Sequence, residues 1–322
     1  MNTSTAARSA STPAGSTPHG ERIFVGPDPL PEVLAAVADA GCTLVDSLGD
    51  AEGVVWFGRD PAAIKEALPA TVRWLQTPDA GAERWIAAGM TDGPWVVTCA
   101  AGAYGPQIAE HALALLLACV HGLPAYARAQ VWDSTAWRVR SVADMRVLVV
   151  GAGGIGAHLT LLLDALGSAV TVLSRSGRLV PGARACAPAG ELDALLPRAD
   201  AIVLAAPATS ATAHLMNDER FALTRADAVL VNVARGTLVD SGALLRALDS
   251  GRLGSAGLDV TNPEPLPAGD PLLRHPRVII TPHVANPPER KRAAFAELVR
   301  ANCELFRLGQ PLAGVIDVER GY

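Results

Sequence analysis

The chain has 322 residues, of which 50% are hydrophobic and 18% charged, and its formal net charge is −5 at pH 7. This length favours two domains, each large enough to bury a core of its own. The weak negative charge gives no reason to expect nucleic acid or an anionic membrane as a partner. The five cysteines are scattered without a C-x-x-C pair, which indicates reduced thiols in the cytoplasm and favours neither disulfides nor a bound metal.

Residues 1–20 are rich in Ser, Thr, Ala, Pro and Gly and contain almost no large apolar side chain. Because they cannot bury enough surface to order the backbone, the sequence predicts a disordered tail. The tail lacks the apolar stretch of a secretory signal. No run of about 18 apolar residues follows it, so we expect no membrane span.

From Arg22 to about Ala101, strand-like and helix-like runs alternate, which predicts a small α/β unit with a parallel sheet. The expected strands are Arg22–Gly26, Thr43–Val45, Gly53–Phe57, Val72–Gln76 and Trp95–Cys99. The expected helices are Pro31–Ala40, Pro61–Leu68 and Ala82–Ala88. A long helix from Gln107 to about Ala127 and an irregular connector at Trp132–Arg140 come next.

A glycine-rich turn stands at the centre of the chain. The apolar run Val147–Val150 predicts a buried strand, and Ile155–Leu166 predicts a helix. Between them, the G-x-G-x-x-G spacing permits a tight turn, close approach to a pyrophosphate, and close packing of helix on strand. The helix N-terminus then offers free N–H groups to the phosphates of a dinucleotide. The cofactor contacts expected here are Gly151, Gly153, Gly154, Ile155 and Gly156.

The alternation resumes after this turn, and six strands with intervening helices match the doubly wound dinucleotide-binding fold. The five further strands are Val170–Leu173, Ala201–Ala205, Ala228–Val233, Ala256–Val260 and Val278–Thr281. A final amphipathic helix, Glu289–Leu308, is expected to return to the first unit. The predicted domains are therefore a substrate-binding one at 21–103 and 289–322 and a dinucleotide-binding one at 104–288.

Three strand ends in the second unit carry side chains suited to redox chemistry. His283, Arg235 and Glu264 each follow a different strand, and ligands of open parallel sheets bind beyond the carboxyl ends of the strands. A histidine can transfer a proton, an arginine can clamp a carboxylate, and a glutamate can hold the imidazole. Taken singly, each could be an ordinary surface residue, but together they favour a reaction site.

The second strand of this unit ends in Ser174-Arg175-Ser176, with Arg178 close behind. NAD-specific folds of this type place an Asp or Glu here, about 20 residues after the first glycine, to bind the ribose hydroxyls. A carboxylate would repel a 2′-phosphate, whereas a hydroxyl and a guanidinium can bind one. The sequence therefore predicts a preference for NADP, with NAD also possible; the alternative is a solvated turn in an arginine-rich chain.

A series of motifs resembles the signatures of the D-isomer-specific 2-hydroxyacid dehydrogenases. They are Asn232-Val-Ala-Arg-Gly236, Val239-Asp240, Leu244 to Leu248, Gly251, Ala256-Gly-Leu-Asp-Val260, Pro263-Glu-Pro265 and Thr281-Pro-His283. Upstream, Ile108-Ala-Glu110, Trp137 and Ala205-Ala-Pro-Ala-Thr209 fall where that family has its counterparts. The resemblance spans about residues 22 to 317. Leu75-Gln76, Ala80-Gly81 and the Ser-Arg-Ser turn are most similar to the glyoxylate/hydroxypyruvate reductase branch.

The resemblance implies a doubly wound (Rossmann) nucleotide domain with a smaller flavodoxin-like substrate domain. It implies that His283 protonates the carbonyl oxygen, that Glu264 pairs with His283, and that Arg235 binds the substrate carboxylate. Backbone N–H groups near Ala80 and Gly81 would bind the same carboxylate. The further implied contacts are Asp259 with the nicotinamide amide, Pro207 and Val233 with the cofactor, and Trp56 with the pocket. One departure is Ala82-Glu83, where the family usually has Val-Asp.

The resemblance also implies a homodimer, formed through the helix from Gln107 and the arm at Trp132–Arg140. The remaining histidines are expected to be structural and without partners; they are His111, His121, His158, His214 and His275.

The sequence thus predicts reduction of a small 2-oxo acid to the D-2-hydroxy acid in a cleft between two domains, where closure excludes water. Phosphoglycerate or phosphonate oxidation is the first alternative. The second is a cofactor-sensing corepressor of the C-terminal-binding type, which would bind the cofactor without steady turnover.

Overall fold

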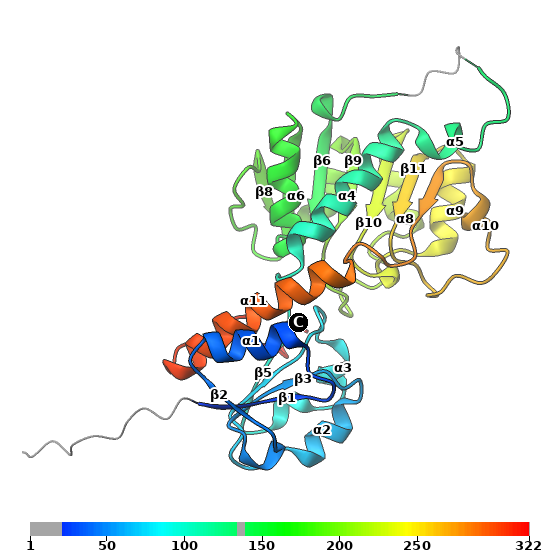
Figure 1. The fold of residues 1–322 in the computed structure, drawn as a ribbon. Coiled ribbons are helices and arrows are strands. Elements are labelled where there is room, and N and C mark those ends of the chain that lie inside the picture. Colours follow the sequence, from blue (N-terminus) through cyan, green and yellow to red (C-terminus); the bar gives the residue numbers. More distant parts are fainter. Residues whose placement is uncertain (1–20, 134–138, 322) are drawn as a thin grey trace, which may run out of the picture.

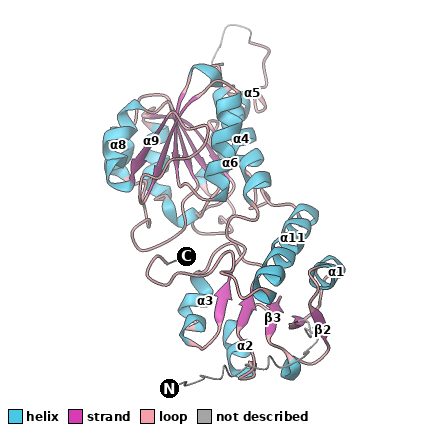
Figure 2. Ribbon diagram, turned by 90° about the vertical axis from the view of Figure 1, so that its left-hand side faces the viewer, coloured by secondary structure: helices cyan, strands magenta, loops and turns pink. Residues whose placement is uncertain are grey.

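The computed structural model describes residues 21–133 and 139–321, which form two α/β units joined at a narrow waist (Figure 1). Each unit has one parallel sheet with helices packed against it (Figure 2). The predicted tail at residues 1–20 and the motif residue Trp137 lie outside the described residues.

The smaller unit contains a five-stranded sheet in the order β2-β1-β3-β4-β5, with every pairing parallel. Its strands are β1 (Arg22–Gly26), β2 (Thr43–Val45), β3 (Gly53–Trp56), β4 (Trp74–Gln76) and β5 (Val96–Thr98). Its helices are α1 (Pro31–Asp39), α2 (Pro61–Ala67) and α3 (Glu83–Ala87). This strand order is that of flavodoxin, so the predicted fold of the smaller unit is confirmed.

The C-terminal helix α11 (Pro288–Arg307) crosses the waist and packs against α1 of the smaller unit (Figure 1). Its side chains Phe295, Val299 and Cys303 are buried in one cluster with Ile23 and Val37. An amphipathic helix is stabilised mainly by burying such an apolar face. The end of the chain thus completes the core of its beginning.

The larger unit contains a seven-stranded sheet in the order β12-β11-β10-β9-β6-β7-β8, again all parallel. Its strands are β6 (Arg146–Val150), β7 (Ala169–Ser174), β8 (Ala185–Pro188), β9 (Ala201–Leu204), β10 (Ala228–Asn232), β11 (Leu253–Leu258) and β12 (Val278–Ile280). Its helices are α4 (Gly105–Val120), α5 (Leu123–Tyr126), α6 (Gly154–Ala165), α7 (Leu192–Leu195), α8 (Asp218–Leu223), α9 (Ser241–Asp249) and α10 (Pro271–Arg274). The predicted doubly wound fold is confirmed.

The prediction of six strands was wrong, because β8 is a seventh. Its sequence, Ala-Cys-Ala-Pro, contains no β-branched or aromatic residue, so it carries no strand signal of its own. It adds to the sheet only at the outer edge, where the proline at its end is tolerated.

Two other predicted elements also differ. The long helix from Gln107 to Ala127 is two helices, because Gly122 takes a left-handed conformation with φ of 67° between α4 and α5. Strand β11 begins at Leu253, ahead of the predicted Ala256. Gly254 lies inside this strand, and a Cβ atom there would come within 2.7 Å of the Asp227 carbonyl oxygen.

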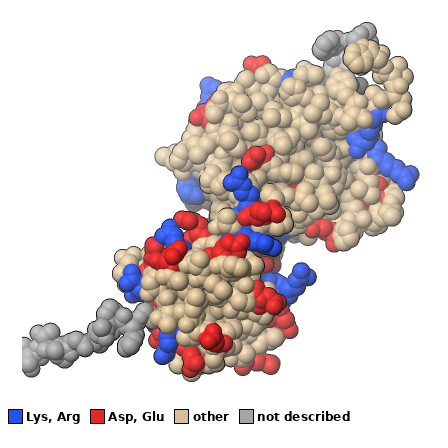
Figure 3. All heavy atoms as spheres, viewed as in Figure 1, with Lys and Arg blue, Asp and Glu red and all other residues tan. Residues whose placement is uncertain are grey.

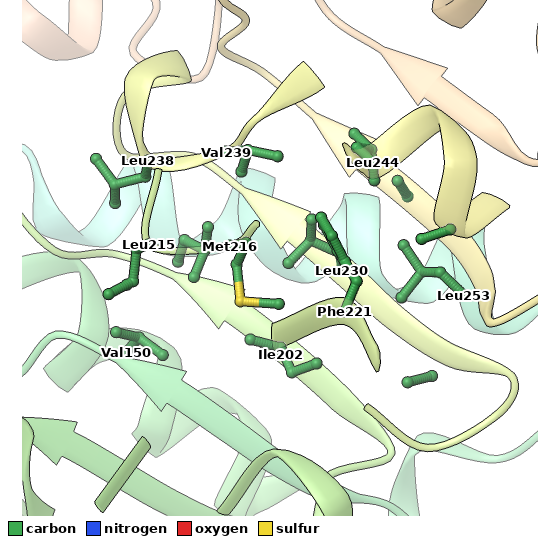
Figure 4. Close-up of a cluster of buried hydrophobic side chains, with 14 of the residues drawn as sticks. Val150, Ile202, Leu215, Met216, Phe221, Leu230, Leu238, Val239, Leu244 and Leu253 are labelled. Carbon is green, nitrogen blue, oxygen red and sulfur yellow. The ribbon is translucent and has the colours of Figure 1, made fainter. Parts of the chain in front are cut away.

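Both faces of the larger sheet are buried. On one face, Val150, Ile202 and Leu230 of neighbouring strands are buried in one cluster with Phe221 of α8 and Leu244 of α9 (Figure 4). On the other face, α4 and α6 cover a second apolar cluster. Full burial of such a side chain contributes about 1.5–3 kcal/mol. The strand ends that emerge from this core are therefore firmly placed.

Candidate active site

The glycine turn between β6 and α6 has the geometry of a phosphate cradle. Gly151 has a φ of 117°, and a Cβ atom there would overlap the Ala205 carbonyl oxygen. A Cβ atom on Gly156 would overlap the Gly151 carbonyl oxygen, so the helix packs closely on the turn. At Gly153, in contrast, nothing lies within 4 Å of such an atom. Gly153, which caps the N-terminus of α6, thus faces open space beside free helical N–H groups. A pyrophosphate fits such a site, because the N–H groups can donate to its oxygens.

His283 and Glu264 form a hydrogen-bonded pair at the carboxyl edge of the larger sheet. The distance from His283 Nδ1 to Glu264 Oε1 is 2.6 Å. Since an ionised carboxylate accepts hydrogen bonds only, Nδ1 carries the hydrogen and Nε2 is the ring nitrogen left for other partners. His283 has a φ of 53°, which is uncommon for a residue with a side chain and typical of functional positions.

A buried carboxylate supports the loop that carries His283. Asp259, which is 2% exposed, accepts hydrogen bonds from Thr281 Oγ1 at 2.6 Å, from Val284 N at 2.9 Å and from Ala285 N at 3.1 Å. The amide of His283 donates to the Asp259 carbonyl oxygen at 2.9 Å. Three hydrogen bonds satisfy the buried carboxylate, whose burial without partners would cost free energy. Asp259 therefore fixes the backbone on both sides of the imidazole.

His111 belongs to the same network, which the sequence did not reveal. Its Nε2 lies 2.9 Å from Thr281 Oγ1 and 3.4 Å from Asp259 Oδ1. The prediction that the remaining histidines have no partners was therefore wrong for His111. It was also wrong for His158, which contacts the Gly154 carbonyl oxygen, and for His275, which contacts Asp249. The sequence gives no signal for the His111 contacts, because a helix residue meets a strand end about 170 positions away.

Arg235 links the two units. Its Nε lies 3.3 Å from Glu83 Oε1, which is contributed by the start of α3 in the smaller unit. A Cβ atom on Gly81 would overlap both the Glu83 carboxylate and Arg235 Nη2, so all three groups converge on one point. Ala80 is exposed beside them. Arg235, His283 and Glu264 come from the larger unit, whereas Ala80, Gly81 and Glu83 come from the smaller.

The loop that carries Ala80 and Gly81 is held from both sides. Asp79 accepts hydrogen bonds from Arg84 Nε and Trp85 Nε1, each at 2.7 Å. Tyr104, at the junction with the larger unit, donates its hydroxyl to the Pro78 carbonyl oxygen at 2.7 Å. Burial raises the pKa of the Tyr104 phenol, so it stays a neutral donor. The loop therefore faces Arg235 in a fixed position.

The turn after β7 lies over the glycine turn. Ser174 Oγ accepts a hydrogen bond from the Gly177 amide at 3.1 Å, and Arg178 Nη2 donates to the Ala152 carbonyl oxygen at 2.5 Å. Arg175 and Ser176 are exposed at its tip. The four polar side chains thus surround the end of β7, next to the cradle.

The other predicted contacts lie at neighbouring strand ends. Pro207, exposed after β9, accepts a hydrogen bond from Thr212 Oγ1 on its carbonyl oxygen at 2.8 Å, and Val233 is buried after β10. In the smaller unit, Trp56 Nε1 and Thr77 Oγ1, at the ends of β3 and β4, are buried with no hydrogen-bond partner among the described residues.

In the part of the chain that the structure describes, no helix is both long and apolar enough to cross a membrane.

Comparisons with known proteins show the family of this chain. Residues 113–285 match the family profile of the D-isomer specific 2-hydroxyacid dehydrogenase, NAD binding domain. A glyoxylate/hydroxypyruvate reductase A from Serratia proteamaculans is 34% identical over 221 residues, which cover 67% of this chain and 69% of the relative.

Two solved structures are similar over almost the whole chain. A D-isomer specific 2-hydroxyacid dehydrogenase from Xanthobacter autotrophicus Py2, in complex with NADPH and MES, superposes with a TM-score of 0.81 at 27% identity and covers 94% of this chain and 100% of its own. An NADPH-dependent glyoxylate/hydroxypyruvate reductase from Sinorhizobium meliloti, in complex with NADP and sulfate, gives 0.78 at 26% identity with the same coverage. This chain therefore belongs to the D-isomer-specific 2-hydroxyacid dehydrogenases, oxidoreductases that act on CH–OH donors with a nicotinamide cofactor.

Proposed function

We propose that the enzyme reduces a small 2-oxo acid of the glyoxylate or hydroxypyruvate type to the D-2-hydroxy acid between its two units. The observation that carries this proposal is the position of the His283–Glu264 pair and of Arg235 at one sheet edge, with Gly81 of the other unit facing the arginine. A carbonyl next to a carboxylate needs both a proton donor and an anion-binding group, and this edge offers both.

Arg235 holds the substrate carboxylate in this proposal. A guanidinium binds a carboxylate through two parallel hydrogen bonds, which fixes its orientation as well as its position. The backbone N–H groups near Ala80 and Gly81 bind the same carboxylate from the opposite side. Because these groups come from different units, the substrate closes the gap between them and water is excluded as it binds.

His283 supplies the proton. With Nδ1 bound to Glu264, the charged imidazole presents its second proton on Nε2 to the carbonyl oxygen of the substrate. Glu264 is a positioning residue that keeps the ring in this orientation. A bound nicotinamide supplies the hydride to the neighbouring carbon. The transfer converts the carbonyl into a hydroxyl without further groups from the chain.

Residues of the larger unit would hold the cofactor. The pyrophosphate fits the open space at Gly153, next to Gly154 and Ile155, and Pro207 and Val233 are proposed to contact the cofactor at the neighbouring strand ends. Asp259 remains the predicted contact of the nicotinamide amide. At the ribose, Ser174, Arg175 and Ser176 favour NADP over NAD, because this turn contains no carboxylate to repel a 2′-phosphate. Both solved structures described above contain NADPH or NADP.

The proposal is tested by following cofactor absorbance with glyoxylate, hydroxypyruvate, pyruvate and phenylpyruvate, each with NADPH and with NADH. We expect the highest kcat/KM with one of the first two substrates and NADPH. Oxidation of phosphoglycerate or phosphonate in place of these reductions would support the alternative dehydrogenases. Tight cofactor binding with no turnover of any oxo acid would support the sensing protein instead.

We take residues 21–103 with 289–322 as the substrate-binding domain and residues 104–288 as the dinucleotide-binding domain. Arg235 and Glu83 then lie on opposite sides of the domain boundary. A cytoplasmic location remains the prediction from cysteine usage.

We also propose a homodimer formed through the face that carries α4 and α6. The larger unit bears few charged side chains in the view of Figure 3. Helix α6 exposes Leu161 and Leu166. The arm beyond α5 presents Trp132, which is 96% exposed, and large exposed aromatic side chains are typical of subunit contacts. Sedimentation should give about twice the chain mass of 33.3 kDa, and Trp132→Glu should shift it toward the monomer. A monomeric wild-type enzyme at micromolar concentration would contradict this.

A further inference from the structure

Glu83 places a negative charge where the proposed reaction requires the substrate to bind. Its Oε1 lies 3.3 Å from Arg235 Nε, and its carboxylate lies against Gly81, the residue whose backbone is proposed to bind the substrate carboxylate. The Glu83 carboxylate therefore has the same charge, the same arginine partner and the same glycine contact as the substrate group.

The surrounding charges are arranged so that Arg235 is the partner of Glu83. The adjacent Arg84 is bound to Asp79, with 2.5 Å between Nη2 and Oδ2, and its Nη1 donates to the Arg59 carbonyl oxygen. Trp85 also binds Asp79. The two residues that follow Glu83 in the helix are thus both bound to Asp79 of the smaller unit, whereas Glu83 lies against Arg235 of the larger unit.

We propose that Glu83 is a specificity-determining residue that competes with the substrate carboxylate for Arg235. The inference rests on the proposed reduction of a 2-oxo acid. A substrate binds by displacing Glu83 from the guanidinium, so part of its binding free energy is spent on breaking this ion pair. The cost is equal in the ground state and the transition state, and it therefore raises KM while leaving kcat unaffected.

The displaced carboxylate also selects substrates by charge. Glu83 is tethered at the first position of α3, so after displacement it still lies beside the bound substrate. A second negative charge on the substrate is repelled, since like charges placed side by side are disfavoured. Oxo acids with one carboxylate are therefore accepted and 2-oxo dicarboxylates are discriminated against.

The experiment compares Glu83→Gln with the wild-type enzyme, because glutamine keeps the shape and removes the charge. Steady-state reduction is measured with glyoxylate, which has one negative charge, and with 2-oxoglutarate, which has two. We expect KM for glyoxylate to fall by about two- to fivefold, which corresponds to the strength of an exposed ion pair, with kcat unchanged. The fall for 2-oxoglutarate should be larger. Glu83→Asp, which keeps the charge, should restore the discrimination against 2-oxoglutarate.

Glu66→Gln provides the matched control, because it removes the same charge from the exposed side of α2 in the same unit. Its kinetics and thermal midpoint should equal those of the wild type. An unchanged or higher KM in Glu83→Gln, a fall of kcat in step with KM, or an equal gain for the two substrates overturns the assignment. If the wild-type enzyme reduces no 2-oxo acid at all, the proposed function fails instead, so the two failures are distinguishable.

Discussion

The two units present different chemistry at their facing edges. The larger unit holds the groups around its proposed proton donor internally: His283 is paired with Glu264, and Asp259 binds the loop that follows β12. The smaller unit offers backbone groups near Gly81 and one carboxylate, Glu83, whose partner belongs to the other unit. The groups proposed for proton transfer are thus fixed before substrate arrives, whereas the groups proposed for recognition depend on how the units approach each other.

The same contrast holds for the cores. The larger sheet is covered on both faces by helices that lie between its own strands or directly before them. The smaller sheet is covered in part by α11, which comes from the far end of the chain. Its integrity therefore depends on contacts between segments that are more than two hundred residues apart, such as the hydrogen bond of Asn302 with Gln76.

The largest effect is expected at the internally paired edge. His283→Ala should lower kcat by about 10²–10⁴-fold, since it removes the proposed proton donor, while leaving the dissociation constant of the cofactor nearly unchanged. Stopped-flow and steady-state reduction measure the first quantity, and cofactor fluorescence measures the second. His121→Ala, at the far end of α4, is the control and should behave as the wild type. Half of the wild-type turnover in the first variant would exclude His283 from the reaction.

The core of the smaller unit is tested at Asn302, which is 0% exposed. Its Nδ2 donates to Gln76 Oε1 at 2.8 Å and its Oδ1 accepts from Ala313 N at 2.8 Å. Asn302→Ala leaves buried polar groups without partners. We therefore expect the free energy of unfolding to fall by about 1–3 kcal/mol, as measured by calorimetry.

In the larger unit, Asn217→Ala removes only the N-terminal cap of α8, so it should lower the free energy of unfolding by about 1 kcal/mol. If Asn302→Ala destabilises the protein less than Asn217→Ala, the smaller unit does not depend on the hydrogen bonds that Asn302 makes.

A smaller effect is expected at the end of β7. Arg175→Ala should remove most of the preference for NADPH over NADH, which we expect to be at least about tenfold in kcat/KM, mainly by raising the KM for NADPH. Arg184→Ala removes an equal charge beside β8, at the amino edge of the same sheet, and should leave the preference intact. A wild-type enzyme that works as well with NADH would show that this turn does not bind the phosphate.

The smallest effect concerns an ion pair at the amino edge of the larger sheet, away from the cleft. Hydrogen bonds from Arg146, opposed by partial burial, hold the pKa of Asp200 below its ordinary value of 3.8. Because the folded state favours the carboxylate, this pair stabilises the fold above that ordinary value, and the contribution is lost as pH falls through the lowered pKa.

Asp200→Asn should therefore lower the free energy of unfolding by about 1 kcal/mol at pH 7 and leave it unchanged in strong acid. Denaturant titrations at several pH values measure the difference, and Asp193→Asn, at an exposed ion pair, is the control. A constant difference at every pH would show that the carboxylate charge is not what stabilises this edge.

The sequence by itself determined the elements that local patterns encode. Apolar runs such as Val147–Val150 and the spacing from Gly151 to Gly156 depend on neighbours a few residues away, and the predicted strand, turn and helix were confirmed there. The alternation of strands and helices likewise predicted both parallel sheets. The order of polar residues after the strands also placed Arg235, Glu264 and His283 at one edge, because all parallel strands end on the same side.

Only the tertiary structure decided which distant groups meet. Strand β8 exists because β7 provides an edge to pair with, and its own composition does not favour a strand. His111 meets Thr281, and Glu83 meets Arg235, across sequence separations for which no local pattern exists. Periodicity and turn chemistry act between near neighbours along the chain, whereas these contacts depend on how whole sheets and helices pack. The charge of Glu83 was therefore visible in the sequence, but its position against the arginine was not.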